Sequence, residues 1–268
     1  DTFQLSEPSD ITASLSVKNL NCLDGPSDGI IFIDAVSGGT PDYRFSTDGI
    51  VFTNLPELRN LPPATYEVII ADASGCEKTY PATIMGPPVL NVTLGDDLLI
   101  PLGATVELTA LSNSANLSYS WSPGDTSGVN DTPSIHVAPL ESTLFNVQVT
   151  DSTTFCKAGD NIFITVSKER KVFIPNAITP DGDGINDGLV IFGGLGIREV
   201  KSFRVFTRTG SQVFEQHSFQ PNDPAYAWPG DFKGQPLNSG VYVYLAEIEF
   251  LDGLTEVFKG DVTLLRKN

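Results

Sequence analysis

The sequence predicts an all-β protein built as three tandem β-sandwich domains. Glycine and proline are frequent, with 24 and 19 copies in 268 residues, and both favour turns over long helices. Apolar and polar residues alternate over many short stretches, which is typical of half-buried strands. No amphipathic helical pattern is evident, and no run of eighteen apolar residues predicts a transmembrane segment.

The first predicted domain covers residues 1–87. Residues 11–18 alternate between apolar and polar side chains, as expected of a strand with one buried face. Apolar runs at residues 29–36 and 65–72 predict further strands, because turn-forming residues bound each of them. The segment Met85-Gly86-Pro87-Pro88 is a predicted linker.

The second predicted domain covers residues 88–168. Alternation around residues 106–110, 145–149 and 162–166 predicts strands of a second sandwich. Trp121 lies on an early strand, where a core tryptophan is expected. The alternative is an exposed tryptophan that stacks on a sugar.

The third predicted domain covers residues 169–268 and follows the charged segment Lys168–Lys171, which we interpret as a hinge. Residues 242–250 are apolar on both faces at first, as in a central strand. In the last strand Phe258, Val262 and Leu264 share one face, and this alternation fixes the register.

The net charge of −17 is unevenly distributed. Residues 1–167 hold 5 basic and 20 acidic side chains, a net of −15, whereas residues 168–268 hold 11 and 13, a net of −2. Such an acidic surface repels phosphate backbones, so no nucleic-acid partner is expected. This charge is better explained as a means of keeping an extracellular protein in solution than as a binding surface for a specific cationic partner.

Catalytic motifs are absent from the sequence. The two histidines, His136 and His217, have no neighbouring residues at the spacing of a zinc site or a nucleophilic triad. No nucleotide-binding glycine loop precedes a predicted helix. We therefore expect a protein that is not an enzyme.

The best candidate site is the acidic, glycine-rich loop at residues 181–188. Asp181, Asp183 and Asp187 offer carboxylate oxygens, and the Ile185 carbonyl and Asn186 supplement them, a set suited to Ca²⁺. The alternative is a metal-free turn in which these carboxylates accept backbone amides. Both interpretations remain open at the level of the sequence.

Four motifs in the last hundred residues carry a family resemblance. They read FIPNAITPDGDGIND from Phe173, RVFTRTGSQVF from Arg204, GQPLNSGVYVY from Gly234 and KGDVTLL from Lys259. In order and spacing they resemble the gliding motility-associated C-terminal domain, the type B sorting domain of type IX secretion in Bacteroidota. The chain departs from that family by having Thr207 and Thr209 where Asn and Trp are usual, and Pro229 in place of Asp.

Two weaker resemblances concern the preceding domains. GGTPDYRF at residues 38–45 and TYEVIIADASGC at residues 65–76 resemble the SprB repeat of Bacteroidota surface adhesins. That resemblance implies a disulfide between Cys22 and Cys76, leaving Cys156 unpaired, and the alternative is two free core thiols. Closing this loop would add roughly 4 kcal/mol on the chain-entropy model. Residues 104–166 resemble PKD-like or immunoglobulin-like modules.

Together these resemblances imply the C-terminal part of a secreted, adhesin-like protein of the outer cell surface. Its last domain would address the type IX translocon and outer-membrane attachment proteins, and the preceding domains would be stalk or adhesive units, in contact with surface polysaccharide or other adhesin modules. The alternative is a carbohydrate-binding tail of a larger secreted enzyme, with contacts through Trp121, Trp228 or nearby tyrosines.

Overall fold

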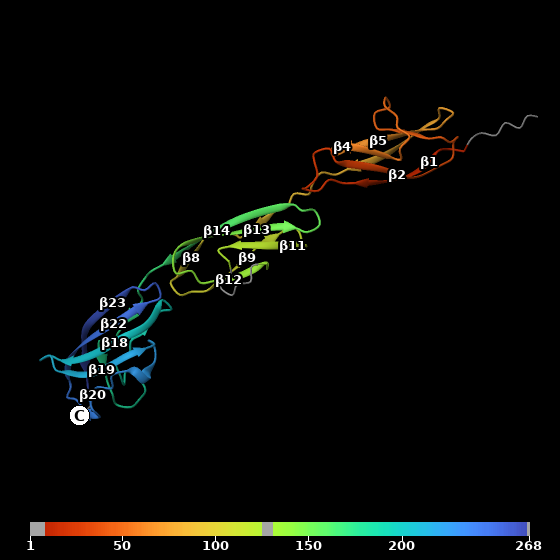
Figure 1. Cartoon of the computed structure of the whole chain (residues 1–268). Coiled ribbons are helices and arrows are strands. Elements are labelled where there is room, and N and C mark those ends of the chain that lie inside the picture. Colours follow the sequence, from red (N-terminus) through yellow and green to blue (C-terminus); the bar gives the residue numbers. More distant parts are fainter. Residues whose placement is uncertain (1–8, 125–130, 267–268) are drawn as a thin grey trace, which may run out of the picture. The chain divides into compact units, whose positions relative to one another are not determined.

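The computed structural model describes residues 9–124 and 131–266. Within these ranges the regular elements are β-strands and one 3-10 turn, η1 (Pro224–Tyr226). Figure 1 shows the strands as arrows along the chain. The predicted all-β sandwich class is confirmed. Among the same residues, the structure contains no helix that could cross a membrane.

The chain divides into two compact units. Unit 1 comprises Asp1–Thr93, Leu111–Ser120 and Gln148–Asp160, and unit 2 comprises Leu94–Ala110, Trp121–Val147 and Asn161–Asn268. The strands form three consecutive sets, at residues 12–84, 92–167 and 172–264, and the sheets join strands within a set. Since the middle set contributes to both units, the domain boundaries after residues 87 and 168 stay predictions.

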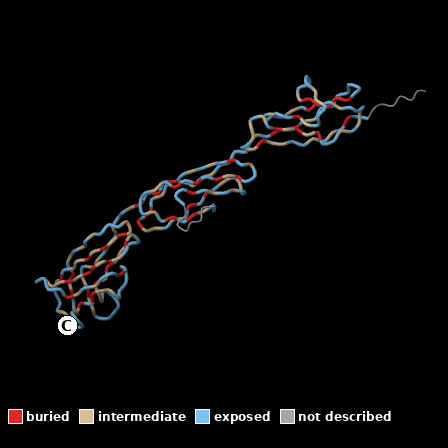
Figure 2. Tube along the Cα trace, viewed as in Figure 1, coloured by how far each residue is buried: buried red, intermediate tan, exposed pale blue. Residues whose placement is uncertain are grey.

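The first set is a sandwich of two three-stranded sheets. One sheet has the order β1-β2-β4, and the other has the order β3-β5-β6. Its strands are β1 (Thr12–Lys18), β2 (Gly29–Ser37), β3 (Arg44–Ser46), β4 (Glu57–Leu61), β5 (Ala64–Ala71) and β6 (Glu77–Ile84). Inward-facing residues of both sheets form one apolar core that includes Ile31, Phe45, Leu58, Val68 and Ile84. Figure 2 shows buried positions recurring between exposed ones along the trace.

The predicted disulfide Cys22–Cys76 is wrong. Cys22 is bonded to Cys156, with 4.9 Å between their Cα atoms, and Cys76 is free and exposed. The reason is strand direction. Cys76 immediately precedes β6, whereas the amide of Leu20, near Cys22, donates to the carbonyl of Met85, just beyond the other end of β6. Eight residues of extended strand span about 26 Å, far more than the roughly 7 Å between Cα atoms that a disulfide can bridge.

The middle set contains eight strands in three sheets, ordered β10-β7, β12-β9 and β11-β13-β14-β8. The strands are β7 (Val92–Thr93), β8 (Leu98–Pro101), β9 (Val106–Thr109), β10 (Leu111–Ser112), β11 (Leu117–Ser122), β12 (Ser134–Val137), β13 (Thr143–Asp151) and β14 (Lys157–Ser167). The inward positions of β13 and β14 are buried at every second residue, as their sequence alternation predicts. Trp121 is 5% exposed and belongs to this core.

The last set lies in unit 2 and is built on a five-stranded sheet of order β16-β23-β22-β18-β19. Its long strands are β18 (Ile197–Thr207), β19 (Gln212–Phe219), β22 (Gly240–Phe250) and β23 (Thr255–Leu264). The short ones are β15 (Val172–Phe173), β16 (Ala177–Ile178), β17 (Phe192–Gly193), β20 (Asp231–Phe232) and β21 (Gln235–Pro236). As predicted, β22 is central, and Val262 and Leu264 of β23 are fully buried.

Candidate functional site

The motif-bearing segment at residues 172–193 is tied into the last sheet at several points. β15 pairs with β17, while β16 runs parallel to the final strand β23, with Ala177 opposite Thr263 and Ile178 opposite Leu264. The amide of Leu265 extends this pairing by donating to the Ile178 carbonyl at 3.0 Å. The beginning and the end of the last set of strands therefore hold each other in place.

The acidic loop follows directly and is organised by Asp187. One carboxylate oxygen of Asp187 accepts the amides of Asp181 (3.0 Å) and Gly182 (2.8 Å), and the other accepts the amide of Gly184 (2.8 Å). The amides of Gly182 and Gly184 lower the pKa of Asp187 from its ordinary value. Gly182 and Gly184 both have φ near +85°, the conformation in which glycine carries no steric penalty.

The remaining predicted ligands lie in the same loop. Asp183 accepts the amide of Ile185 at 2.8 Å, and the Asn186 carbonyl accepts the amide of Thr179 at 2.8 Å. One carboxylate oxygen from each of Asp181, Asp183 and Asp187 lies within 4.8 Å of the other two.

These facts fit each of the two interpretations of the loop. The amide bonds are those of a metal-free turn, and they account for its shape without an ion. The clustered carboxylates are the hard ligands that Ca²⁺ prefers. Once the amides are counted, Asp187 keeps one free lone pair, on the oxygen that accepts the Gly184 amide. The metal site therefore stays a prediction.

Trp228 lies in the core of the last set of strands. It is fully buried, its backbone exchanges hydrogen bonds with Leu189, and its indole Nε1 donates to the Asp231 carbonyl at 2.9 Å. The ring packs against Tyr242 with 4.9 Å between centroids. The tight turn after Pro229 needs Gly230, which has φ of +76° and lies so close to Leu264 that a Cβ would clash with its side chain.

Arg266 closes the same region from the C-terminal side, a role that no sequence pattern indicates. Its guanidinium donates to the carbonyls of Leu237 (2.9 Å) and Gly230 (2.8 Å). Charged donors on backbone carbonyls are among the stronger hydrogen bonds. The chain end after β23 is therefore fastened to the turns at residues 230–239.

Neither tryptophan is available to stack on a sugar. Trp121 is buried and donates from Nε1 to the Thr132 carbonyl at 2.9 Å, and Trp228 is fully enclosed. An exposed aromatic pair does exist at Phe173 and Phe192, but the two rings are tilted by 32°. The prediction that Trp121 is a core residue is confirmed.

The segment Lys168–Lys171 is not the free charged hinge that its composition indicates. Arg170 is largely buried, donates to Asp252 at 2.7 Å and lies over the Phe250 ring at 4.3 Å. Lys168 pairs with Glu141 at 2.6 Å. Because these acidic and aromatic partners come from distant positions in unit 2, the local composition could not reveal them.

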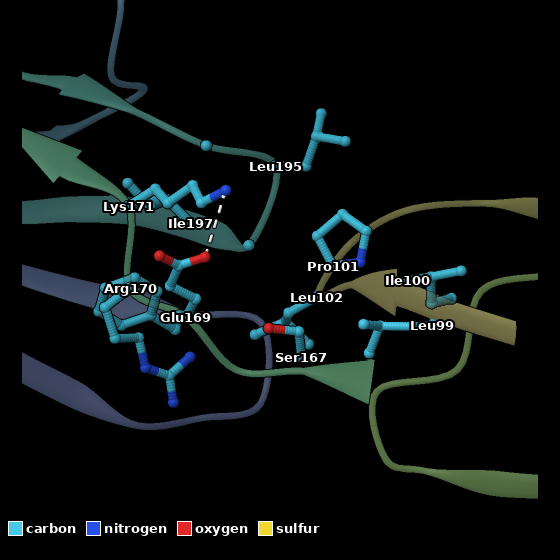
Figure 3. Close-up of a pocket in the computed structure, with 13 residues that line it drawn as sticks. Leu99, Ile100, Pro101, Leu102, Ser167, Glu169, Arg170, Lys171, Leu195 and Ile197 are labelled. Atoms are coloured by element: carbon cyan, nitrogen blue, oxygen red, sulfur yellow. Dashed lines mark ion pairs between the residues drawn. The ribbon is translucent and has the colours of Figure 1, made fainter. Parts of the chain in front are cut away.

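A cavity of about 420 Å³ lies beside this segment in unit 2 (Figure 3). Its walls come from residues 99–102, 167–171 and 194–197, and are mostly apolar. Figure 3 shows the ion pair between Lys171 and Glu169, 3.2 Å apart, beside the apolar side chain of Ile197. Glu169 is the one carboxylate in the lining, so the cavity holds no cluster of metal-ligating side chains.

The comparison that bears on function concerns the last set of strands. Residues 172–264 match the CHU_C type IX secretion signal domain. This signal marks a protein that is secreted and attached to the cell surface. The match begins at β15 and ends at β23, so it covers the acidic loop, Trp228 and the whole five-stranded sheet. The residues that match the type IX secretion signal domain are therefore the same residues that form this complete sheet.

No curated protein matches the chain. Among solved structures, the three N-terminal domains of the bacteriophage RB49 Hoc protein align over 97% of this chain and 100% of theirs, at 11% identity and a TM-score of 0.42. Titin domains I67–I69 align over 97% and 99%, at 10% identity and a TM-score of 0.39. A Ca²⁺-stabilised adhesin of an Antarctic bacterium aligns over 96% and 75%, at 14% identity and a TM-score of 0.33. Scores at this level carry no argument about function.

Proposed function

We propose that this chain is the C-terminal part of an adhesin-like surface protein of a Bacteroidota cell. Its last domain is the address that the type IX machinery reads, and the preceding sandwiches are stalk or adhesive units. The match of residues 172–264 to the type IX secretion signal domain is the observation that carries this proposal. The SprB-like character of residues 1–87 and the PKD-like character of residues 88–168 are part of the proposal.

The architecture supports a folded address. A translocon that acts on a folded domain recognises its surface. The segments at residues 172–193 and 255–266 meet in one sheet, because β16 pairs with β23. The partners in this proposal are the translocon, the outer-membrane attachment proteins and, for the stalk, surface polysaccharide or other adhesin modules.

The chain's own role in this proposal is not enzymatic. His217 is exposed, its Nε2 lies 3.0 Å from Glu215 and its Nδ1 lies 3.2 Å from the Lys201 carbonyl, so it belongs to a surface pair of side chains on β19. Catalytic groups are usually found in clefts and not on an exposed strand face. This environment supports a binding and positioning role for the chain.

The alternative, a sugar-binding tail of a secreted enzyme, has less support. Sugar rings stack on flat, solvent-facing aromatic surfaces, and both tryptophans are buried. The exposed Phe173 and Phe192 are not coplanar, and they belong to the secretion signal domain.

Deleting residues 169–268 tests the main proposal. We expect the shortened protein to be exported across the inner membrane and retained in the periplasm of a type IX-competent cell. The matched control is the full-length Cys76→Ser protein, which alters only an exposed side chain and should reach the surface. Surface display of the shortened protein would contradict the proposal.

We also propose that the acidic loop binds Ca²⁺ through Asp181, Asp183 and Asp187, with Ile185 and Asn186 as supplementary ligands. The cluster of three carboxylate oxygens within 4.8 Å supports this. An ion between them would offset the mutual repulsion of like charges.

Asp183→Asn in the full chain is the sharpest test of the calcium proposal. The amide side chain keeps an oxygen for the Ile185 amide but removes one charge. In chelator the variant should be at least as stable as the parent, while in Ca²⁺ only the parent should gain thermal stability. Asp261→Asn, on β23, is the control for net charge. If Ca²⁺ raised the thermal stability of the parent and of Asp183→Asn equally, the calcium proposal would be contradicted and the metal-free turn would be the remaining interpretation.

A further inference from the structure

The disulfide divides the chain into one large loop and two tails. Cys22 and Cys156 are 134 positions apart in the sequence. Strands β2 to β13 all lie inside this loop, whereas β1 precedes Cys22 and β14 begins directly after Cys156. The covalent path from β1 to β14 therefore has two branches, one through the loop and one through the S–S bond.

Tight turns hold both cysteines. On one side, Asp24 accepts the amide of Asn21 at 2.9 Å, and Asn21 accepts the amide of Leu23 at 2.9 Å. On the other side, Asp151 accepts the amides of Thr153 and Thr154. The two turns are also joined directly, because the Cys22 amide donates to the Thr154 carbonyl at 3.0 Å. Both cysteines of the disulfide thus lie in hydrogen-bonded turns that contact each other.

We propose that this disulfide is a mechanical bypass, which carries tension past the residues that it encloses. Tension that enters N-terminal to Cys22 and is resisted C-terminal to Cys156 follows the shortest covalent path. That path runs through β1, the disulfide and β14, so it leaves residues 23–155 out of the load. The chain between the two cysteines then cannot be extended, because the S–S bond carries the tension instead. The hydrogen bonds of β1 to β2 and of β14 to β8 stay on the loaded path.

The two strands on this path are suited to carry tension. A β-strand already rises by about 3.3 Å per residue, close to the upper limit of roughly 3.3–3.6 Å for a fully stretched chain. β1 and β14, with 7 and 11 residues, can therefore transmit force with little lengthening. A surface-attached protein gains a nearly inextensible connection through its first two sets of strands.

The biological use of the bypass rests on the proposed function. The type IX secretion signal domain begins at residue 172, C-terminal to Cys156, so a surface attachment there places the disulfide between the cell and anything held N-terminal to Cys22. The mechanical property itself depends only on where the bond lies in the chain.

Single-molecule stretching between the two chain ends tests this proposal. The parent for the comparison is the Cys76→Ser protein, which keeps the disulfide and removes the free thiol. The test variant adds Cys22→Ser and Cys156→Ser. With the disulfide intact, residues 23–155 should contribute no extension. The variant should release about 440–480 Å of additional contour length, since 134 residues extend by roughly 3.3–3.6 Å each.

A second experiment, with reductant, measures the same extra contour length without depending on how well the variant folds. The same extra length should appear in the Cys76→Ser protein once a phosphine reductant is added, and not before. Equal contour lengths for parent and variant in the absence of reductant would overturn the proposal. Because the purified chain is stretched outside the cell, this outcome is separate from any failure of surface sorting.

Discussion

The backbone amide of Asp151 donates to the carbonyl of Cys156 at 2.9 Å, while the Asp151 carboxylate accepts the amides of Thr153 (2.8 Å) and Thr154 (2.9 Å). The hydroxyl of Ser114 donates to the other carboxylate oxygen. A single aspartate at the end of β13 thus shapes the turn that presents the disulfide partner of Cys22.

The first prediction concerns pH. The Ser114 hydroxyl and the amides of Thr154 and Thr153 lower the pKa of Asp151 from 3.8 to about 2. A carboxylate whose pKa is lower in the folded than in the unfolded state stabilises the fold at any pH above its unfolded pKa. This stabilisation is lost as the pH falls from about 4 to about 2. Asp151→Asn should therefore be less stable than the parent at pH 7, and the difference should shrink below pH 4. Urea midpoints at pH 7, 4, 3 and 2 measure it. A difference that does not change with pH would exclude the charge as its cause.

The second prediction concerns the cysteines. Thiol counting on unfolded, unreduced protein should give one free group, and peptide mapping should place it at Cys76. Removing the disulfide with Cys22→Ser and Cys156→Ser should lower the free energy of unfolding by roughly 2–5 kcal/mol, because the loop it closes is long. The control is Cys76→Ser, which should change stability little. Recovery of a peptide in which Cys22 is linked to Cys76 would contradict the structure.

The third prediction concerns Trp228. Replacing this fully buried side chain with alanine should lower the free energy of unfolding by about 3–5 kcal/mol, the usual cost of truncating a core aromatic residue. The matched control is Thr209→Ala, at an exposed turn position where the resembling family usually has tryptophan, and it should change stability by less than about 0.5 kcal/mol. Urea unfolding followed by circular dichroism measures both. A larger effect at Thr209 than at Trp228 would show that the core has been misassigned.

Most of the fold could be predicted because strand signals are local. The alternation at residues 11–18 and in the last strand corresponds to β1 and β23, and the burial of Val262 and Leu264 follows it. The acidic loop was also within reach, since glycines at residues 182 and 184 indicate positive φ angles and the three aspartates were expected to converge.

The pairings that were missed depend on which strand ends meet in space. Cys76 and Cys22 lie at opposite ends of β6, a fact that follows from the hairpin of β5 and β6 and not from the spacing of the cysteines. Arg170 pairs with Asp252, which lies 82 residues further along the chain. The composition of the charged segment at residues 168–171 contains no trace of this partner and therefore indicated a solvated hinge. Arg266 binds backbone carbonyls, which leave no trace in side-chain patterns.

The central claim is that residues 169–268 are sufficient as a surface address. The direct measurement fuses these residues behind an unrelated exported protein and scores protease accessibility of the fusion on intact, type IX-competent cells. The same fusion carrying Trp228→Ala is the control for folding. We expect the first fusion to be accessible at the surface and the second to remain inside. A fusion that stays in the periplasm, although its last domain is folded and protease-resistant in extracts, would contradict the account.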